Sequence, residues 1–293
     1  MKILVAALFK NSLGGGSGSF MECVYNTLKY GNTQYTEIID LNDMNNDSII
    51  IDYEQFDFII CSHQSILKLL RTKKLNAKIM CISQGWIPEE ERFIPGADVY
   101  VSISEEVRKY NLKKQNIDSI VIRQPIITRR VSFNPIKKDI TMLRGLYIKN
   151  GASSDSNILR ETGSYSGFDI RESEKKYDIF QQIQWSDFVI GLGRSALEGM
   201  SYGKPAIVAD TRWYHDYPCG DGLLTSDVIH KSRECNYSGR AFNELLTKEW
   251  LTLQLNDLKE DYLEHSKFSH KYIEENHDAD LIVAQYIDIL KSI

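Results

Sequence analysis

Residues 187–210 read DFVIGLGRSALEGMSYGKPAIVAD, and this stretch decides the fold that we expect. Apolar residues at 188–190 predict a buried strand, and the two glycines at 191–193 predict a tight turn after it. A short helix should follow and end at Gly203, before a second apolar strand at 206–208. A strand–turn–helix–strand unit of this kind can hold a phosphate on the backbone N–H groups of its turn.

The first 125 residues show the same alternation of apolar strands and helices. Strands that are buried on both faces read as continuous apolar runs, so this pattern favours a parallel sheet with helices on both sides. The predicted strands are Ile3–Leu8, Tyr35–Ile39, Phe58–Cys61, Lys78–Ile82, Val99–Ile103 and Ser119–Ile122. A glycine turn follows the first strand, before a helix predicted from Ser19, and its residues Gly15, Gly16, Ser17 and Gly18 are predicted to form a loop at a ligand cleft.

Residues 123–138 contain two prolines and five basic residues without clear periodicity, which indicates a domain boundary. We therefore predict an α/β protein with two Rossmann-like, doubly wound domains, at 1–125 and 126–293. The second domain should end in helices that pack back toward the first. Ligands bind at the carboxyl ends of the strands in such sheets, so both glycine turns should face a central cleft.

The composition argues against several classes of function. The chain has 293 residues, is 42% hydrophobic and 26% charged, and carries a formal net charge of −5, so it has no general attraction to nucleic acid or anionic membranes. Its five cysteines are scattered without a CxxC pair, which predicts neither a zinc site nor a disulfide framework and fits a cytoplasmic protein. No apolar stretch approaches the roughly 20 residues of a membrane span.

Two residues of the opening stretch have competing interpretations. Ser195 and Glu198 have the spacing of a capping box, in which the glutamate caps its own helix. Alternatively, Glu198 accepts hydrogen bonds from the hydroxyl groups of a ribose. Arg194 lies within the glycine turn, where its planar set of donors favours a role in binding a diphosphate.

The same stretch also satisfies a dinucleotide-binding pattern. Residues 191–196 match G-x-G-x-x-A, and Asp210 ends the next strand near the usual acidic position. An NAD-dependent oxidoreductase is therefore an alternative function. Against it, the predicted helix is short for a dinucleotide crossover, and the pattern normally opens the first βαβ unit of a domain.

Three motifs taken together resemble a group of bacterial glycosyltransferases of the GT-B fold, from families 4 and 1. They are G-x-G-R-S-x-L-E-x-M-x-x-G-K-P at 191–205, G-D-G-L-x-T at 220–225 and N-x-S-G-R at 236–240. The similarity covers residues 185–241 well, whereas the N-terminal half matches only in general architecture. The resemblance implies a hexosyl- or pentosyltransferase that moves a sugar from a nucleotide-sugar to an acceptor hydroxyl, without a cofactor or a bound metal.

The resemblance also assigns roles to individual residues. The donor, usually a UDP-sugar, would be held by the C-terminal domain. Glu198 matches the glutamate that binds the ribose in the family. Arg194 and the backbone N–H groups of Gly191, Gly193 and Ser195 would meet the diphosphate.

The chain departs from the family pattern at one acidic position. Many retaining members carry an acidic residue eight positions before the ribose-binding glutamate, and Ile190 stands there. The stereochemistry of transfer is therefore open, and a non-catalytic sugar-nucleotide sensor is a further alternative. Arg144 and Lys149 are candidates for the basic pair that the family carries early in its C-terminal domain.

Inversion at the sugar would need a general base near the acceptor, and the sequence offers two histidines for this role. His63 follows the third predicted strand, although a histidine at the start of a helix often has no catalytic role. His215 lies in an aromatic loop, Trp213–Tyr217, which can stack on a base or a sugar or pack on its own domain.

The resembling proteins suggest a surface polysaccharide or a lipid-linked glycan as acceptor. An alternative acceptor is DNA with hydroxymethylated bases, as for small phage enzymes of the GT-B fold. In that case Lys10, Arg123, Arg129 and Arg130 should line the mouth of the cleft.

Overall fold

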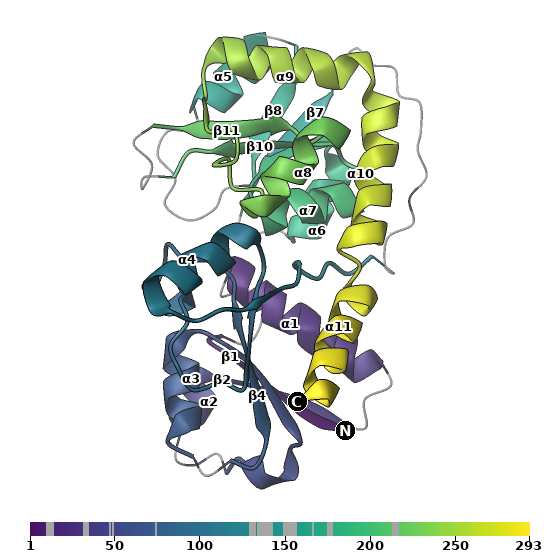
Figure 1. Cartoon of the computed structure of the whole chain (residues 1–293). Coiled ribbons are helices and arrows are strands. Elements are labelled where there is room, and N and C mark those ends of the chain that lie inside the picture. Colours follow the sequence, from purple (N-terminus) through teal and green to yellow (C-terminus); the bar gives the residue numbers. More distant parts are fainter. Residues whose placement is uncertain are drawn as a thin grey trace. The chain divides into compact units, whose positions relative to one another are not determined.

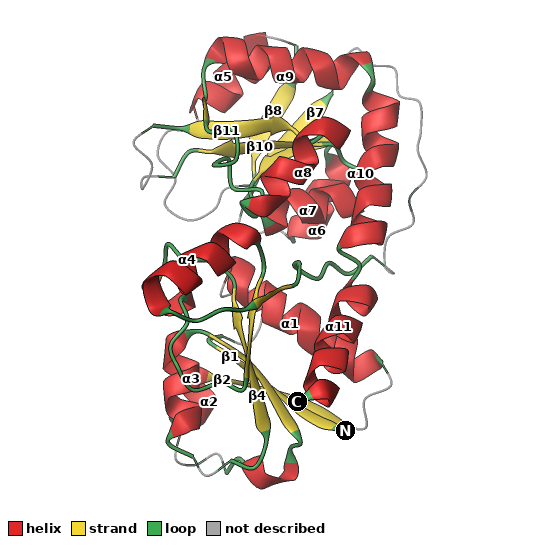
Figure 2. Cartoon of the chain, viewed as in Figure 1, coloured by secondary structure: helices red, strands yellow, loops and turns green. Residues whose placement is uncertain are grey.

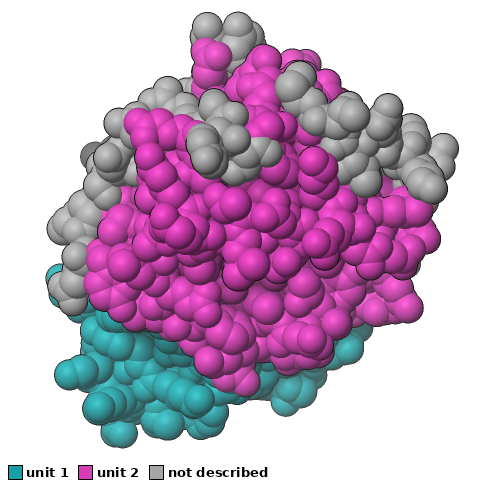
Figure 3. Space-filling model, turned by 90° about the horizontal axis from the view of Figure 1, so that it is seen from above, with its two compact units in different colours: residues 1–127, 277–293 teal, residues 128–276 magenta. Residues whose placement is uncertain are grey.

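A computed structural model describes residues 1–9, 15–31, 35–46, 48, 50–73, 75–128, 133, 143–148, 157–165, 167–174, 178–212 and 217–293. Figure 1 labels their helices and strands, and Figure 2 colours them by type. The chain forms two compact units, which are coloured separately in Figure 3. Unit 1 comprises Met1–Ile127 and His277–Ile293, and unit 2 comprises Thr128–Asn276.

This division differs from the predicted domains of 1–125 and 126–293 mainly at the C-terminus. The first segment of unit 1 ends at Ile127, close to the predicted boundary. Residues 277–293, however, belong to unit 1, because the last helix contributes to the core of that unit. The chain therefore runs through unit 1, then through unit 2, and returns to unit 1.

Unit 1 is built on a six-stranded sheet in which every adjacent pair is parallel, in the order β2-β1-β3-β4-β5-β6. Its strands are β1 (Lys2–Ala7), β2 (Tyr35–Asp40), β3 (Phe58–Ser62), β4 (Lys78–Ser83), β5 (Val99–Ser102) and β6 (Ile120–Val121). The six strands predicted for this half are confirmed, and each bound agrees to within one residue. Their apolar runs are buried on both faces, which is the pattern that made them recognisable.

The helices described in unit 1 include one whose start differs from the prediction. They are α1 (Gly15–Tyr30), α2 (Leu41–Met44), α3 (Gln64–Arg71), α4 (Glu105–Gln115) and α11 (Ala279–Ser292), with the 3-10 helices η2 (Tyr53–Gln55) and η3 (Glu89–Glu91). The sequence predicts a loop through Gly18 and a helix from Ser19, whereas the glycines from Gly15 onward form the first turn of α1. Glycine weakens helix propensity, but packing of the apolar face of α1 on the sheet overrides it.

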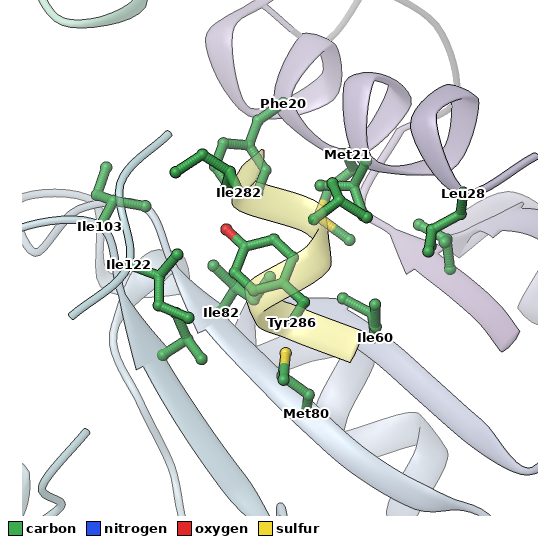
Figure 4. Close-up of a cluster of buried hydrophobic side chains, with 14 of the residues drawn as sticks. Phe20, Met21, Leu28, Ile60, Met80, Ile82, Ile103, Ile122, Ile282 and Tyr286 are labelled. Carbon is green, nitrogen blue, oxygen red and sulfur yellow. The ribbon is translucent and has the colours of Figure 1, made fainter. Parts of the chain in front are cut away.

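The sheet of unit 1 is covered by helices on both faces. Ile3 and Val5 of β1 lie in the core shared with α1 and α11, whereas Leu4 and Ala6 lie in the core shared with α3. This alternation follows from the two-residue period of a strand. Figure 4 shows the first of these cores, with Tyr286 of α11 among the apolar side chains of the sheet and of α1.

Two backbone hydrogen bonds join the returning chain to the end of the first segment. The N–H of Ile126 donates to the carbonyl oxygen of His277 at 2.7 Å, and the N–H of Ala279 donates to the carbonyl oxygen of Ile126 at 2.9 Å. The ring Nδ1 of His277, which is buried, lies 2.9 Å from the carbonyl oxygen of Gln124. Helix α11 is therefore attached where the chain leaves the sheet of unit 1.

Unit 2 is also built on a six-stranded sheet, in the order β12-β11-β10-β9-β7-β8. Its strands are β7 (Arg144–Tyr147), β8 (Asp169–Glu172), β9 (Phe188–Gly191), β10 (Ala206–Asp210), β11 (Cys219–Leu223) and β12 (Glu244–Leu245). The strands β7 to β10 pair in parallel, and β11 and β12 run antiparallel to their neighbours. The strands predicted at 188–190 and 206–208 are confirmed as β9 and β10.

Helices cover both faces of this second sheet as well. They are α5 (Asn157–Tyr165), α6 (Ile179–Trp185), α7 (Arg194–Ser201), α8 (Ser226–Glu234), α9 (Lys248–Glu260) and α10 (Tyr262–Asn276). Helices α5 and α9 share one core with the sheet, and α7 packs against β9, β10 and α10. Among the described helices of the whole chain, none is long and apolar enough to cross a membrane.

Candidate functional site

Each unit has a topological switch point at the carboxyl edge of its sheet. In unit 1 the neighbours of β1 are β2 on one side and β3 on the other, and in unit 2 the neighbours of β7 are β8 and β9. Ligands of open α/β sheets bind outside the carboxyl ends of the strands at such points. The predicted glycine segments follow β1 and β9, so the topology places each of them at the switch point of its own unit.

In the turn after β9, two of the backbone N–H groups that were predicted to bind a phosphate donate to carbonyl oxygens of the chain instead. Gly193, the N-cap of α7, has φ 46° and ψ −120°, which only glycine adopts readily. Its N–H donates to the carbonyl oxygen of Tyr237 at 2.8 Å, and the N–H of Ser195 donates to that of Leu192 at 2.9 Å. These two amides are already bonded within the chain, so they do not form the expected phosphate cradle. A Cβ on Gly191 would lie 3.2 Å from Ser195 Cβ, and this glycine therefore serves close packing.

Arg194 and Glu198 form an ion pair along the first turn of α7. Arg194 Nε lies 2.7 Å from Glu198 Oε1, and the two side chains are only 12% and 15% exposed. The capping-box interpretation is wrong, because Gly193 and not Ser195 occupies the N-cap position of this helix. Glu198 is instead oriented by a charge-assisted hydrogen bond between residues four apart on one helix face.

Arg144 lies where the strands of the sheet begin, whereas the glycine turn lies at their carboxyl ends. It is the first residue of β7, and Asp187, which directly precedes β9, accepts hydrogen bonds from its backbone N–H at 2.9 Å and from its Nε at 3.3 Å. Arg144 therefore does not lie beside the glycine turn after β9. Lys149, its partner in the predicted basic pair, lies outside the described residues, and so does His215, the second candidate for the general base.

The motif at 220–225 contributes to the sheet rather than to a ligand-binding turn. Asp221 lies in β11 beside an irregularity in the pairing with β10. Its Oδ2 accepts a hydrogen bond from Ser232 Oγ at 2.6 Å, and its Oδ1 accepts one from the N–H of Phe242 at 3.0 Å. This buried carboxylate therefore anchors α8 and the following turn to the sheet.

Asp210 ends β10 at the same edge as the glycine turn and is completely buried. Arg212 Nε donates to its Oδ1 at 2.8 Å, and a terminal nitrogen of the same guanidinium donates to its Oδ2 at 2.6 Å. A dinucleotide site needs this carboxylate to reach a ribose. Because Asp210 is covered and held by Arg212, the structure argues against the dinucleotide interpretation.

The motif at 236–240 forms a turn that packs on this edge. Tyr237 has φ 51°, a left-handed conformation that is uncommon for a bulky residue. Burial holds it there, together with a hydrogen bond of 2.8 Å from its N–H to the carbonyl oxygen of Ser232. A Cβ on Gly239 would lie 3.3 Å from Asp210 Cβ, so the turn lies directly against the end of β10.

Two arginines at this edge were not assigned from the sequence. Burial, together with the negative charges of Asp210 and Asp221, raises the pKa of Cys219 to about 11, and the positive charges of Arg240 and Arg212 act in the opposite direction. Both guanidinium groups therefore lie near the start of β11. Their positions in the sequence could have indicated them. Arg240 directly follows the glycine of the motif at 236–240, and Arg212 lies two residues after the end of β10.

In unit 1, His63 and the start of α1 lie at the same switch point. Strands β1 and β3 are neighbours in the sheet, with Ala6 opposite Cys61. His63 directly follows the carboxyl end of β3, and α1 is the first helix after β1. The structure therefore brings His63 to the edge where Gly15–Gly18 begin α1, whose Gly16 is exposed. The ring Nδ1 of His63 lies 2.8 Å from Ser62 Oγ, and the side chain is buried.

Burial lowers the pKa of His63 below its ordinary value of 6.5. The negative charge of Glu90 and a backbone hydrogen bond with Ser62 oppose this shift. The Glu90 carboxylate also accepts a hydrogen bond from the N–H of Ser65 at 3.1 Å, at the start of α3. The imidazole is thus neutral at neutral pH, which is the state that can accept a proton.

Comparison with known proteins identifies the fold. No family model and no curated protein matches the chain. Among solved structures, the apo form of the lipopolysaccharide outer core galactosyltransferase WaaB matches with a TM-score of 0.50 and 15% identity, over 92% of this chain and 99% of that one. MurG of Acinetobacter baumannii matches with a TM-score of 0.50 and 10% identity, over 100% and 99% of the two chains.

A third solved structure, the kitacinnamycin glycosyltransferase, matches with a TM-score of 0.50 and 8% identity, over 98% of both chains. These neighbours are glycosyltransferases of the GT-B fold. Together with the two doubly wound sheets, the likeness confirms the predicted GT-B fold for this chain.

Proposed function

We propose that the protein is a glycosyltransferase that moves a sugar from a UDP-sugar, bound by unit 2, to an acceptor hydroxyl. The observation that carries this proposal is the Arg194–Glu198 pair at the start of α7, beside the switch point of a GT-B unit. The fold supports the reaction class, because its solved neighbours include a galactosyltransferase. The buried Asp210–Arg212 pair disfavours the NAD-dependent alternative.

Glu198 is the residue that we assign to the ribose of the donor. A carboxylate only accepts hydrogen bonds, and bonds from hydroxyl groups to it are charge-assisted. The bond from Arg194 Nε orients the carboxylate through Oε1, and Oε2 is the atom that we assign to the ribose hydroxyl groups. Low exposure of both side chains lowers the local dielectric constant and strengthens these bonds.

The second requirement of the reaction is a base that removes the proton of the acceptor. We assign this role to His63, whose buried imidazole is neutral at neutral pH. Ile190, fully buried in β9, takes the place of the acidic residue that many retaining relatives of this fold carry. Both observations favour inversion at the sugar over retention, with preorganised charges stabilising the leaving diphosphate.

The test of this proposal is the affinity for UDP of wild-type protein and of Glu198→Gln. The variant keeps the shape of the side chain and removes its charge. We expect its Kd for UDP to rise by about 10- to 100-fold, because a hydrogen bond to a charged group contributes about 1.5–3 kcal/mol. Glu234→Gln, an exposed change of the same kind at the end of α8, is the control and should bind UDP like wild type.

Thermal-shift measurements with UDP, NAD and NADP separate the alternatives. Stabilisation by NAD or NADP without stabilisation by UDP would contradict the proposal. A lower melting temperature of Glu198→Gln with unchanged UDP affinity would assign Glu198 a structural role only. Binding of a UDP-sugar without transfer or slow hydrolysis would identify a non-catalytic sensor.

For the acceptor we propose a hydroxyl group of a surface polysaccharide or a lipid-linked glycan. The DNA alternative relies on four basic residues, of which only Arg123 lies within the described part of the chain. Incubation with a UDP-sugar and either glycan or hydroxymethylated DNA separates the two. The mass of one sugar residue should appear on the glycan and not on the DNA.

A further inference from the structure

The glycine turn before α7 leaves the diphosphate of the proposed donor without its expected partners. The N–H groups of Gly193 and Ser195 already donate to carbonyl oxygens of the chain. A bound diphosphate carries several negative charges, so donors and positive charge must come from a neighbouring segment. The turn at 236–240 is such a segment, because its Tyr237 carbonyl accepts the bond from Gly193.

Ser238, at the centre of this turn, has a buried hydroxyl without a hydrogen-bond partner. The residue is 5% exposed, and its Oγ makes no hydrogen bond within the chain. Most buried hydroxyl groups in folded proteins are satisfied, so this one needs an explanation. A serine hydroxyl can donate to a phosphate oxygen, and a change of χ1 between staggered rotamers re-aims it at low cost.

The contacts of its two neighbours place Ser238 at the carboxyl ends of β9 and β10. On one side, the carbonyl oxygen of Tyr237 accepts the N–H of Gly193, two residues after the end of β9. On the other side, a Cβ on Gly239 would lie 3.3 Å from the Cβ of Asp210, which ends β10. The unpartnered hydroxyl therefore belongs to the same edge as the proposed ribose site.

Two guanidinium groups supply positive charge at this edge. The bidentate bond to Asp210 fixes the position of Arg212 beside the end of β10. Arg240 directly follows Gly239, and its charge acts on Cys219, which lies opposite Asp210 in the pairing of β10 with β11. The carboxylates of Asp210 and Asp221 act on the same position, so an anion would be bound here by the N–H donors of the two guanidinium groups rather than by an excess of positive charge.

We propose that Ser238, Arg212 and Arg240 form the diphosphate subsite of the donor site. The two guanidinium groups bind phosphate oxygens, and the Ser238 hydroxyl donates to one of them. This inference rests on the proposed function, since it locates the diphosphate of the same UDP-sugar. The start of α7 then binds the ribose through Glu198, and the turn at 236–240 binds the phosphates.

The experiment compares UDP with uridine, which lacks the phosphates. Ser238→Ala and Arg240→Gln are measured beside Arg171→Gln, an exposed arginine of β8 in the same unit, paired with Asp169. Calorimetry gives the Kd of UDP, and ligand-observed NMR gives that of uridine. We expect the Kd of UDP to rise about fivefold in Ser238→Ala and about tenfold or more in Arg240→Gln, with that of uridine unchanged. The control should bind both ligands like wild type.

Ser238→Ala also has a readout that a purely structural residue would not give. Removing a hydroxyl that has no partner leaves the melting temperature of the unliganded protein unchanged or raises it. A loss of UDP affinity at constant melting temperature therefore arises from the ligand contact. Arg212 is not substituted, because its loss would leave the buried charge of Asp210 without this partner.

Three outcomes would overturn the inference, and they differ in what they say of the donor site. If both variants bind UDP within about twofold of wild type while Glu198→Gln weakens UDP, the subsite is wrong and the proposed function stands. Equal weakening of UDP and uridine also overturns it, because the contacts would then act on the nucleoside. Absence of UDP binding by wild-type protein overturns both proposals.

Discussion

His63 combines a strained backbone with a buried, titratable side chain. Its φ of 73° and ψ of 145° lie in a region that non-glycine residues avoid, at a cost on the order of 1–3 kcal/mol. The strain occurs at the carboxyl end of β3, where the sheet topology predicts ligand binding. Strained residues held in such places are often functional, which supports the role that we assign to this imidazole.

We predict that the transfer reaction keeps its rate down to a pH below the ordinary histidine pKa of 6.5. A general base must be unprotonated, and burial lowers the pKa of His63 while Glu90 partly opposes the shift. The acid limb of kcat/KM, measured from about pH 5 to pH 8, should therefore have its midpoint below 6.5, and His63→Asn should lose about 100-fold or more in rate. An acid limb centred above 6.5, or a fully active His63→Asn, would exclude His63 as the base.

The same pKa shift fixes the sign of a stability effect. The pKa of His63 is lower in the folded than in the unfolded chain, so the unfolded chain binds the proton first as the pH falls. The stability that neutral His63 contributes is present above the unfolded pKa and is lost as the pH falls toward the folded one. His63→Asn should therefore show a weaker loss of stability between neutral and mildly acidic pH than wild type.

At the scale of elements, helix α7 packs so closely on β9 that there is no room for a side chain at position 199. A Cβ built on Gly199 would overlap the side chain of Val189. Gly16, in the first turn of α1, offers a contrast, because an added Cβ there meets nothing within 4 Å. The two glycines therefore differ in environment although both lie in helices.

We predict that Gly199→Ala destabilises unit 2 by about 1–3 kcal/mol, although the change from glycine to alanine stabilises most helix interiors. The overlap with Val189 forces α7 away from the sheet. Gly16→Ala should leave the stability unchanged or raise it by less than about 1 kcal/mol. Urea unfolding of the three proteins measures both effects, and equal effects of the two substitutions would contradict the packing argument.

Elements with continuous apolar runs could be predicted from the sequence, and elements defined by their neighbours could not. The strands of unit 1 agree with prediction to within one residue, because burial on both faces selects apolar residues. The edge strand β8, which reads DIRE, and β11, which reads CGDGL, carry no such run. Their pairing is decided by β7 and β10, which lie beside them in the sheet.

At the scale of the whole molecule, α11 supplies part of the core of a unit from which it is separated in sequence by all of unit 2. Its residues Ile282, Val283, Tyr286 and Leu290 are buried against the sheet and α1. Burial of each contributes about 1.5–3 kcal/mol, so together they are comparable to the roughly 5–15 kcal/mol that stabilises a domain. Unit 1 should therefore depend on this helix for folding.

We predict that residues 1–127 do not fold alone, but do fold when joined to residues 277–293 by a short glycine–serine linker. The linker is feasible because the N–H of Ile126 lies 2.7 Å from the carbonyl oxygen of His277. Urea unfolding followed by circular dichroism should be cooperative for the joined chain only. Cooperative unfolding of residues 1–127 alone would show that α11 is dispensable.

The sequence by itself determined the strands of unit 1, β9 and β10, because continuous apolar runs are properties of contiguous residues, and its three motifs resemble those of GT-B glycosyltransferases. Only the tertiary structure decided which groups meet. It paired Arg144 with Asp187 at the far edge, and it bonded the N–H of Gly193 to Tyr237. Burial and hydrogen-bond partners depend on residues distant in sequence, so the place of α11 and the unpartnered hydroxyl of Ser238 appear only in the folded chain.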